Sequence, residues 1–172
     1  NLIMPLMSIG QATEVLMLWL LGRAMTRLGT KRVLLLALGA QVLRFTVFAI
    51  GGPFPLVVAV ITMHGLCYAF FFTASYIYID EHSSRQSRAG AQQLYTILIM
   101  GFGYFMGHTT AGKLGQWFLD PTTGVIDFHK FWAVPAVGAV LIGLFLLVAF
   151  RAEAPEPHPA PEPEAVPDTD AV

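Results

Sequence analysis

The sequence predicts an all-α transmembrane protein, a bundle of helices that cross a lipid bilayer. Of its 172 residues, 55% are hydrophobic and only 12% are charged, whereas a soluble globular chain carries about twice that charged fraction. The hydrophobic residues are gathered in long runs, and a helix needs about 20 such residues to cross about 30 Å of hydrocarbon. Basic residues are concentrated between alternate runs, which is typical of the loops of multi-pass membrane proteins.

Five runs are long enough to cross the bilayer as helices. They cover approximately residues 2–22, 32–50, 55–79, 89–112 and 131–150. The first run does not resemble a cleaved signal peptide, because no basic segment precedes it and Glu14 interrupts it. Because the chain begins with Asn1 and enters this run at once, we expect a fragment of a longer protein whose upstream helices are missing.

The basic residues predict which connections share one side of the membrane. Arg23, Arg27, Lys31 and Arg32 lie in the first connection, Arg85 and Arg88 lie in the third, and Arg151 follows the last run. The second connection has no basic residue, and the fourth has only Lys113 and Lys130. Basic residues favour the cytoplasmic side. We therefore expect a multi-pass protein of a bacterial inner membrane, with its C-terminus in the cytoplasm and its N-terminus outside.

Residues 152–172 differ in composition from the rest of the chain. Units such as Ala154-Pro155-Glu156-Pro157 are typical of a disordered, partly polyproline-like segment. We therefore divide the chain into a transmembrane bundle, residues 1–151, and an acidic cytoplasmic tail, residues 152–172.

Gln11 and Glu14 are the first candidates for a functional site. They lie three residues apart, so both fall on one face of a helix. A charged side chain near the middle of a bilayer costs several kcal/mol unless it faces the interior of the bundle or a water-filled cavity. Burial disfavours the charged form of a carboxyl group, so Glu14 is also a candidate for exchanging protons with the solvent.

No arrangement of residues in the sequence is typical of an enzyme. Cys67 is the only cysteine and lies within the third run, so the chain offers neither an internal disulfide nor a cluster of metal ligands. It also lacks a Ser/His/Asp grouping and a glycine-rich phosphate loop. We therefore expect no enzyme activity, no cofactor, no metal and no nucleic-acid partner.

The first connection resembles a loop signature of the major facilitator superfamily. Residues 22–32 read GRAMTRLGTKR, which is similar to the superfamily pattern Gly-x-x-x-Asp-Arg-x-Gly-x-Lys/Arg-Lys/Arg. Thr26 stands where the superfamily often has aspartate, so we expect a weaker charge contact between this loop and a neighbouring helix end. An ordinary cytoplasmic loop would explain the charges but not the spacing of the glycines.

Longer stretches resemble the nucleoside:proton symporter family over about residues 1–151. These stretches are residues 8–14, 43–45, 64–71, 76–80, 88–92 and 101–103. The resemblance implies that the five helices correspond to helices eight to twelve of a twelve-helix transporter. The implied function is proton-coupled import of nucleosides by alternating access, with half of the pocket supplied by the missing N-terminal helices.

The same resemblance assigns residues to the pocket. Gln11 and Glu14 match a Gln-x-x-Glu pair that binds the nucleoside, and His64 and Tyr68 match two ring-bearing positions that line the same pocket. Family members commonly have an aspartate after the second ring, implicated in binding and coupling, where this chain has Ala69. Either Glu14 handles the proton alone, or His64 shares the work, or the substrate or coupling mode differs.

Depth in the membrane supports the same pocket. With a rise of about 1.5 Å per residue, Glu14 and His64 lie about 12 to 14 Å from opposite faces of the bilayer. Both are thus near the midplane, where alternating-access carriers hold their substrates. A ribose offers hydroxyls to a carboxylate and an amide, and a nucleobase offers a flat face to Tyr68. Arg44 also lies within an apolar run, where we expect a structural or gating partner for a carboxylate such as Glu14.

Two other classes of function remain open. A major facilitator carrier for another small polar solute, such as a sugar, would keep the architecture and the acid but would not need flat-faced contacts. A membrane enzyme or a non-transporting membrane subunit is the more distant class. Competition between nucleosides and sugars for uptake separates the first class from the nucleoside carrier.

Overall fold

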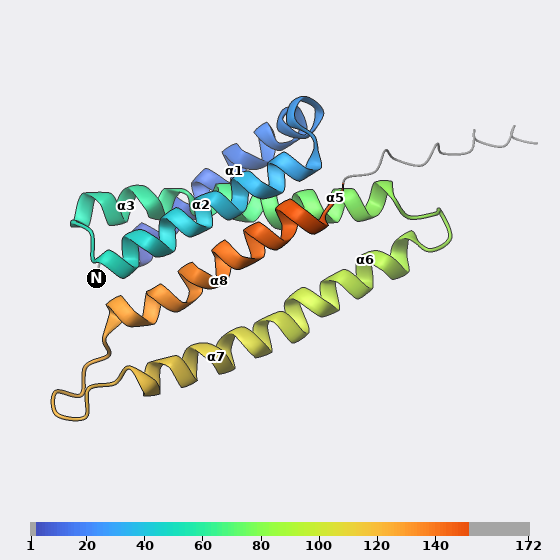
Figure 1. The fold of residues 1–172 in the computed structure, drawn as a ribbon. Coiled ribbons are helices and arrows are strands. Elements are labelled where there is room, and N and C mark those ends of the chain that lie inside the picture. Colours follow the sequence, from blue (N-terminus) through green and yellow to red (C-terminus); the bar gives the residue numbers. More distant parts are fainter. Residues whose placement is uncertain (1–2, 152–172) are drawn as a thin grey trace, which may run out of the picture.

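The computed structural model describes residues 3–151, which form five long helical segments (Figure 1). The first two are α1 (Ile3–Leu28) and α2 (Thr30–Ile50). The third consists of α3 (Phe54–Thr62), α4 (His64–Cys67), the π-helical η1 (Tyr68–Thr73) and α5 (Ala74–Glu81). The fourth consists of α6 (Arg88–Thr96), the π-helical η2 (Ile97–Gly103) and α7 (Tyr104–Trp117), and the fifth is α8 (Phe128–Ala149). The expected tail, 152–172, lies outside the described residues.

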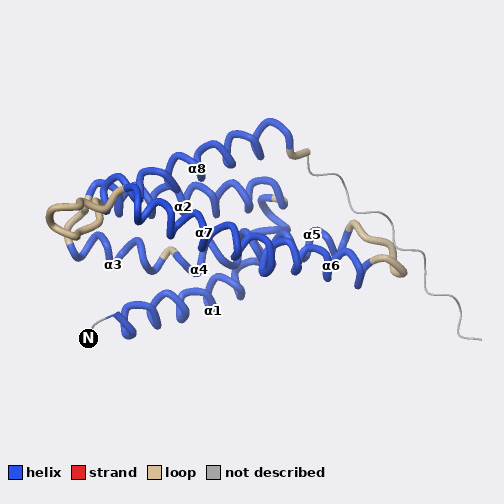
Figure 2. The backbone as a smooth tube through the Cα atoms, turned by 90° about the horizontal axis from the view of Figure 1, so that it is seen from below, coloured by secondary structure: helices blue, strands red, loops and turns tan. Residues whose placement is uncertain are grey.

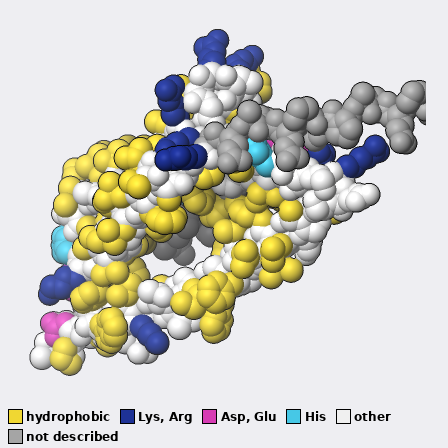
Figure 3. Space-filling model, turned by 45° about the vertical axis from the view of Figure 1, so that its right-hand side comes forward, with side chains coloured by type: hydrophobic (Ala, Val, Ile, Leu, Met, Phe, Trp, Pro, Cys, Tyr) yellow, Lys and Arg dark blue, Asp and Glu magenta, His cyan; other side chains and the backbone are white. Residues whose placement is uncertain are grey.

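Successive segments run in opposite directions. The turn at Gly29, the loop 82–87 and the end of α8 lie at one end of the bundle, and the connections 51–53 and 118–127 lie at the other (Figure 1). Figure 2 shows the longer loops at these two ends. This grouping is the one that the basic residues predict. In Figure 3, most of the Lys and Arg side chains in view gather along the upper edge, others lie at the lower left, and hydrophobic side chains cover much of the flank between them.

The first expected loop is almost absent. α1 continues past the expected limit of its span, residue 22, to Leu28, and only Gly29 separates it from α2. Gly29 has a φ of 76°, a conformation that glycine adopts without steric cost. The expectation of a loop over residues 22–32 is therefore wrong. The helix continues because arginine has a good helix propensity and because its long side chain reaches water from a helix that extends beyond the hydrocarbon.

Three segments in the described part of the chain are long and apolar enough to cross a membrane. They are α2, the third segment Phe54–Glu81, and α8. The first and fourth segments, both expected as spans, are not among them over the described residues. α1 carries Gln11, Glu14 and a basic end, while the fourth segment carries amides, hydroxyls and glycines and continues to Trp117 instead of ending at residue 112. Helices of this composition are typical of segments that face protein or water.

The hydrophobic core lies where α1, α2 and the η1–α5 part of the third segment meet. Its buried residues are Leu21, Val33, Leu34, Ala37, Ala69, Phe70 and Ala74. Small residues among them let the helices approach closely. α8 packs along α2, where Trp132 stacks on Phe45 with the ring centroids 5.6 Å apart.

A tight loop at residues 118–127 joins α7 to α8. The carboxylate of Asp120 accepts hydrogen bonds from the hydroxyl and the backbone N–H of Thr122, and these bonds lower the pKa of Asp120. Asp127 caps α8 by accepting from the N–H of Lys130 and pairs with its ammonium at 2.9 Å, so the pKa of Asp127 is lowered as well. The loop therefore starts α8 with a charged cap.

α7 has no substantial contact with a helix outside its own segment in the described part of the chain. Gly103, Gly107 and Ala111 have the small-residue spacing of closely packed transmembrane helices, yet all three are exposed. Nothing lies within 4 Å of a Cβ added at Gly107. The face that the spacing predicts to be packed is therefore uncovered here.

Candidate functional site

His64 begins α4 directly after a break in the third helical segment. Met63 lies between α3 and α4, and its N–H bonds to the carbonyl of Val60 over 3.2 Å, three residues earlier, as in a tightened turn. From Tyr68 to Thr73 the helix widens to the π form. Short π-helical stretches occur frequently at functional sites.

α1 crosses this break at a distance that requires glycine. A Cβ added at Gly65 would lie 2.3 Å from the backbone nitrogen of Glu14 and 2.6 Å from its Cα. The hydroxyl of Thr13 lies 2.7 Å from the carbonyl of Thr62, the last residue of α3, and 2.7 Å from that of Gly10. It can donate to either, so it links α1 to the end of α3. These contacts fix the turn that carries Glu14 against the third segment.

Arg44 and His64 form a hydrogen bond between α2 and α4. Nη1 of Arg44 lies 3.0 Å from Nδ1 of His64. A guanidinium has donors and no acceptor, so Nδ1 accepts, and His64 is neutral with its proton on Nε2. Among the described residues, Arg44 forms no ion pair with a carboxylate; its partners are His64 and the ring of Phe45, 5.6 Å away. The expected pairing with a carboxylate such as Glu14 is therefore not found.

A cavity of about 470 Å³ lies between α2, the α4–η1 junction and α8. Its polar lining residues are Gln41, Arg44, His64 and Tyr68, and its aromatic ones include Phe45, Phe71 and Phe72. Small-molecule sites typically measure about 300 to 1,000 Å³ and combine an apolar lining with a few polar groups. The cavity thus has the size and the composition of a site for a small, partly polar ligand.

Two of the four predicted binding residues line this cavity. His64 and Tyr68 do, with ring centroids 6.4 Å apart. Gln11 is exposed and Glu14 is half-buried on α1, and neither lines the cavity. α1 meets the third segment at Gly65 and at His64, against which Gly10 lies, but Gln11 and Glu14 are not among the residues that line the cavity. The expectation that all four residues border one pocket is therefore not met within this chain.

Tyr68 also borders a second cavity, of about 280 Å³, between the third and fourth segments. Tyr76 and Tyr95 meet there edge to face, with ring centroids 6.2 Å apart, and Thr73 and Thr96 add hydroxyls. Tyr95 and Thr96 were not predicted as site residues. The sequence feature that could have indicated them is an aromatic residue next to a hydroxyl residue within the apolar run 89–112.

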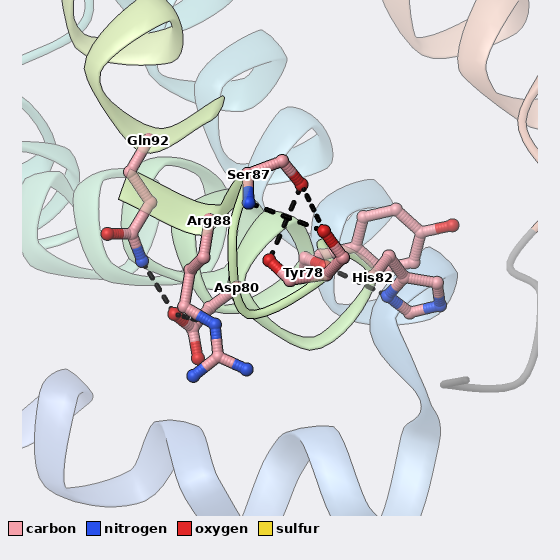
Figure 4. Close-up of polar contacts among 7 residues, drawn as sticks. Tyr78, Asp80, His82, Ser87, Arg88 and Gln92 are labelled. Carbon is pink, nitrogen blue, oxygen red and sulfur yellow. Dashed lines mark hydrogen bonds and ion pairs between the residues drawn. The ribbon is translucent and has the colours of Figure 1, made fainter. Parts of the chain in front are cut away.

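A polar cluster joins α5 to α6 beyond this second cavity (Figure 4). Oδ1 of Asp80 accepts a hydrogen bond from Nε2 of Gln92 over 2.7 Å and lies 3.3 Å from Nε of Arg88. The ring of His82 stacks on that of Tyr78, with centroids 3.9 Å apart. These contacts hold the loop 82–87 and fix the angle at which α6 leaves α5.

The basic segment, residues 23–32, contacts the end of α8 through Lys31. Its Nζ donates a hydrogen bond to the carbonyl of Leu147 over 2.7 Å. Carbonyls in the last turn of a helix lack partners within the helix and carry the negative end of its dipole. The hydroxyl of Thr26 bonds within α1 to the carbonyl of Arg23. It therefore does not replace the charge contact made by an aspartate at this position.

Comparison with known proteins identifies the family. The family model described as nucleoside H+ symporter matches residues 1–155. The chain belongs to this family. It is 27% identical over 150 residues to the nucleoside permease NupG of Escherichia coli (strain K12), 29% over 154 residues to the putative nucleoside transporter YegT, and 27% over 150 residues to the xanthosine permease of the same organism.

The solved structures agree with the fold. A crystal structure of the nucleoside transporter NupG matches with a TM-score of 0.76 at 26% identity, over 85% of this chain and 37% of that one. The chain thus has the all-helical transmembrane fold of the major facilitator superfamily. The sequence matches include 84 to 85% of this chain but only 35 to 36% of the length of the relatives. This extent is consistent with five helices of a twelve-helix transporter.

Proposed function

We propose that this chain is part of a secondary transporter that imports nucleosides together with protons by alternating access. The observation that carries the proposal is the cavity of about 470 Å³ beside His64 and Tyr68, in a bundle of the nucleoside H+ symporter family. Aromatic rings in it offer stacking faces for a base, and a few polar groups offer hydrogen bonds. Transport is proposed over catalysis because the relatives are permeases.

Helices beyond this chain are proposed to complete the site. The chain spans 35% of the length of NupG, and the face of α7 that carries Gly107 and Ala111 is exposed in the described part of the chain. Gln11 is exposed although it lies within an apolar run, and an exposed polar residue in hydrocarbon is costly. We propose that the N-terminal helices of the same transporter cover this face. There Gln11 and Glu14 would bind the ribose of a nucleoside whose base reaches the cavity beside His64, which lies against Gly10 of α1.

Glu14 is the stronger of the two candidates for proton coupling. It is half-buried and forms no ion pair or side-chain hydrogen bond among the described residues. His64 is less free to take a proton, because Nδ1 already accepts from Arg44 and protonation there would place two cations side by side. Ala69 is fully buried in the core, so the position where the family commonly has an acid offers none here.

The proposed location is a bacterial inner membrane with the C-terminus in the cytoplasm. The structure supports the grouping on which this rests, because the first and third connections and the end of α8 lie at one end of the bundle. Basic residues gather at those connections, and positive loops favour the cytoplasmic side.

Uptake of labelled uridine tests the proposal in cells that express the complete reading frame containing this chain. We expect uptake to increase as the external pH falls and to be inhibited by other nucleosides but not by sugars. Glu14→Gln should abolish the dependence on pH and lower uptake at acidic pH to its level at neutral pH, because an amide, unlike a carboxylate, does not take up a proton in this range.

Glu81→Gln is the matched control, because Glu81 lies at the end of α5 and lines neither cavity. We expect it to keep the pH dependence of the unaltered protein. Uptake that responds to sugars but not to nucleosides would instead favour a carrier of another class, and an unchanged pH profile in Glu14→Gln would exclude Glu14 as the coupling group.

A further inference from the structure

We infer that the Arg44–His64 pair makes the cavity prefer nucleosides whose base carries a carbonyl oxygen over those that carry an amino group at the same position. Inosine would thus be favoured over adenosine, and uridine over cytidine. The inference rests on the proposed function and names the substrate class of the same site.

The hydrogen bond between the two residues sets the polarity of this end of the cavity. Arg44 has five N–H donors and no acceptor, and it uses Nη1 toward Nδ1 of His64. The single acceptor of the neutral imidazole is therefore occupied. Only the Nε2–H of His64 and the remaining N–H groups of Arg44 are left for a ligand. Both side chains line the cavity, so both can present donors and neither can present an acceptor.

The charge of Arg44 strengthens this preference. No carboxylate pairs with it among the described residues, and its Nε is buried without a hydrogen-bond partner. A guanidinium without an anionic partner favours hydrogen bonds to acceptors. A ligand that brings an acceptor to the remaining Nη–H groups of Arg44 is therefore favoured over one that brings another donor.

The bases differ in the group that would meet these donors. Inosine and adenosine are alike except at purine C6, which carries an oxygen in the first and an amino group in the second. Uridine and cytidine differ in the same way at pyrimidine C4. Arginine likewise donates hydrogen bonds to the O6 and N7 acceptors of guanine when proteins recognise DNA. A site built of donors rejects an amino group because donor faces donor in a desolvated space.

The rest of the lining does not offset this selection. Gln41 and Tyr68 also line the cavity, and each can both donate and accept, so they favour neither class. Phe45, Phe71 and Phe72 offer apolar ring surface, which contacts every base alike. Discrimination between carbonyl and amino bases is therefore assigned to Arg44 and His64.

The test is competition for uptake by the complete protein in cells. Unlabelled inosine should inhibit uptake of labelled uridine at a concentration about tenfold or more below that of adenosine, and unlabelled uridine should exceed cytidine by a similar factor. In Arg44→Gln, whose amide both donates and accepts, both ratios should fall toward one. Each ratio is measured in the same cells, so a change in the amount of protein does not alter it.

Arg32→Gln is the matched control, because it makes the same substitution on the same helix at an exposed position. Its ratios should equal those of the unaltered protein. If Arg44→Gln does not reach the membrane, Arg44→Lys retains a donor and the charge, and it should keep a reduced preference in the same direction.

Equal inhibition by both members of each pair in the unaltered protein would overturn the inference while leaving nucleoside transport intact. An unchanged preference in a transporting Arg44→Gln variant would overturn the role of Arg44. Absence of uptake and of inhibition for every nucleoside would instead reject the proposed function, so the two failures are distinguishable.

Discussion

Gly65 determines how closely α1 can approach the third helical segment. Its missing side chain leaves room for the backbone of Glu14, which a Cβ would approach to 2.3 Å. Since backbone atoms of a packed helix cannot rotate away as a side chain can, any larger residue must move α1 itself. The position of Glu14 thus depends on a residue that carries no functional group.

Gly65→Ala should therefore separate α1 from α4 and lower both stability and uptake. Overpacking of this kind costs about 1–3 kcal/mol of unfolding free energy, measurable as a lower unfolding temperature of the purified complete protein. Gly107→Ala is the control, because nothing lies within 4 Å of a Cβ at Gly107. Equal unfolding temperatures for Gly65→Ala and the unaltered protein would contradict the close approach.

Single residues were predicted in kind but not in pairing. Glu14 and Arg44 stand out in the sequence because charges are rare in apolar runs, and pairing them is the simplest electrostatic expectation. The structure instead joins Arg44 to His64. Which partner an arginine meets depends on helix rotation and crossing, and these are decided by packing at positions such as Gly65 rather than by the charged residues themselves.

At the scale of elements, Lys31 connects two helices that are far apart in the sequence. It extends from the start of α2 to the carbonyl of Leu147 near the end of α8. An ammonium is stabilising at the C-terminal end of a helix because it compensates the partial negative charge of the last carbonyls. The basic segment therefore also has a structural role at the end of the α2–α8 pair.

Lys31→Met keeps most of the side-chain length and removes the donor. The last turn of α8 should then open more readily, and the amide hydrogens of residues 146–150 should exchange faster by a few-fold, as expected for losing about 0.5–1 kcal/mol. Arg32→Met, at an exposed neighbouring position, should leave that exchange unchanged. Unaltered exchange in Lys31→Met would show that the contact contributes nothing to the end of α8.

The sequence located the five helical segments but not their internal changes. Long apolar runs report where a helix can lie. They do not report the break at Met63 or the π-helical stretches η1 and η2, because these depend on contacts with neighbouring helices. A loop was expected where α1 continues because residues 23–28 include Arg23 and Arg27, and arginine is as compatible with a helix that leaves the membrane as with a loop.

For the whole molecule, the match to NupG confirms the helical transmembrane bundle predicted from composition and the major facilitator fold implied by the family resemblance. The predicted pocket is found only in part, since the cavity of about 470 Å³ is lined by His64 and Tyr68 but not by Gln11 and Glu14. The chain covers about a third of the length of its relatives. We propose that helices beyond this chain cover the exposed faces of α1 and α7.

The most direct test of the account is photolabelling of the complete protein with an azido-substituted uridine, followed by identification of the labelled peptide. Uridine carries the carbonyl that the cavity is inferred to prefer, and its ring is expected to lie against Tyr68. The account predicts label within residues 64–72, removed by excess unlabelled uridine. Label confined to other segments of the protein, or label that uridine does not displace, would contradict a nucleoside site at this cavity.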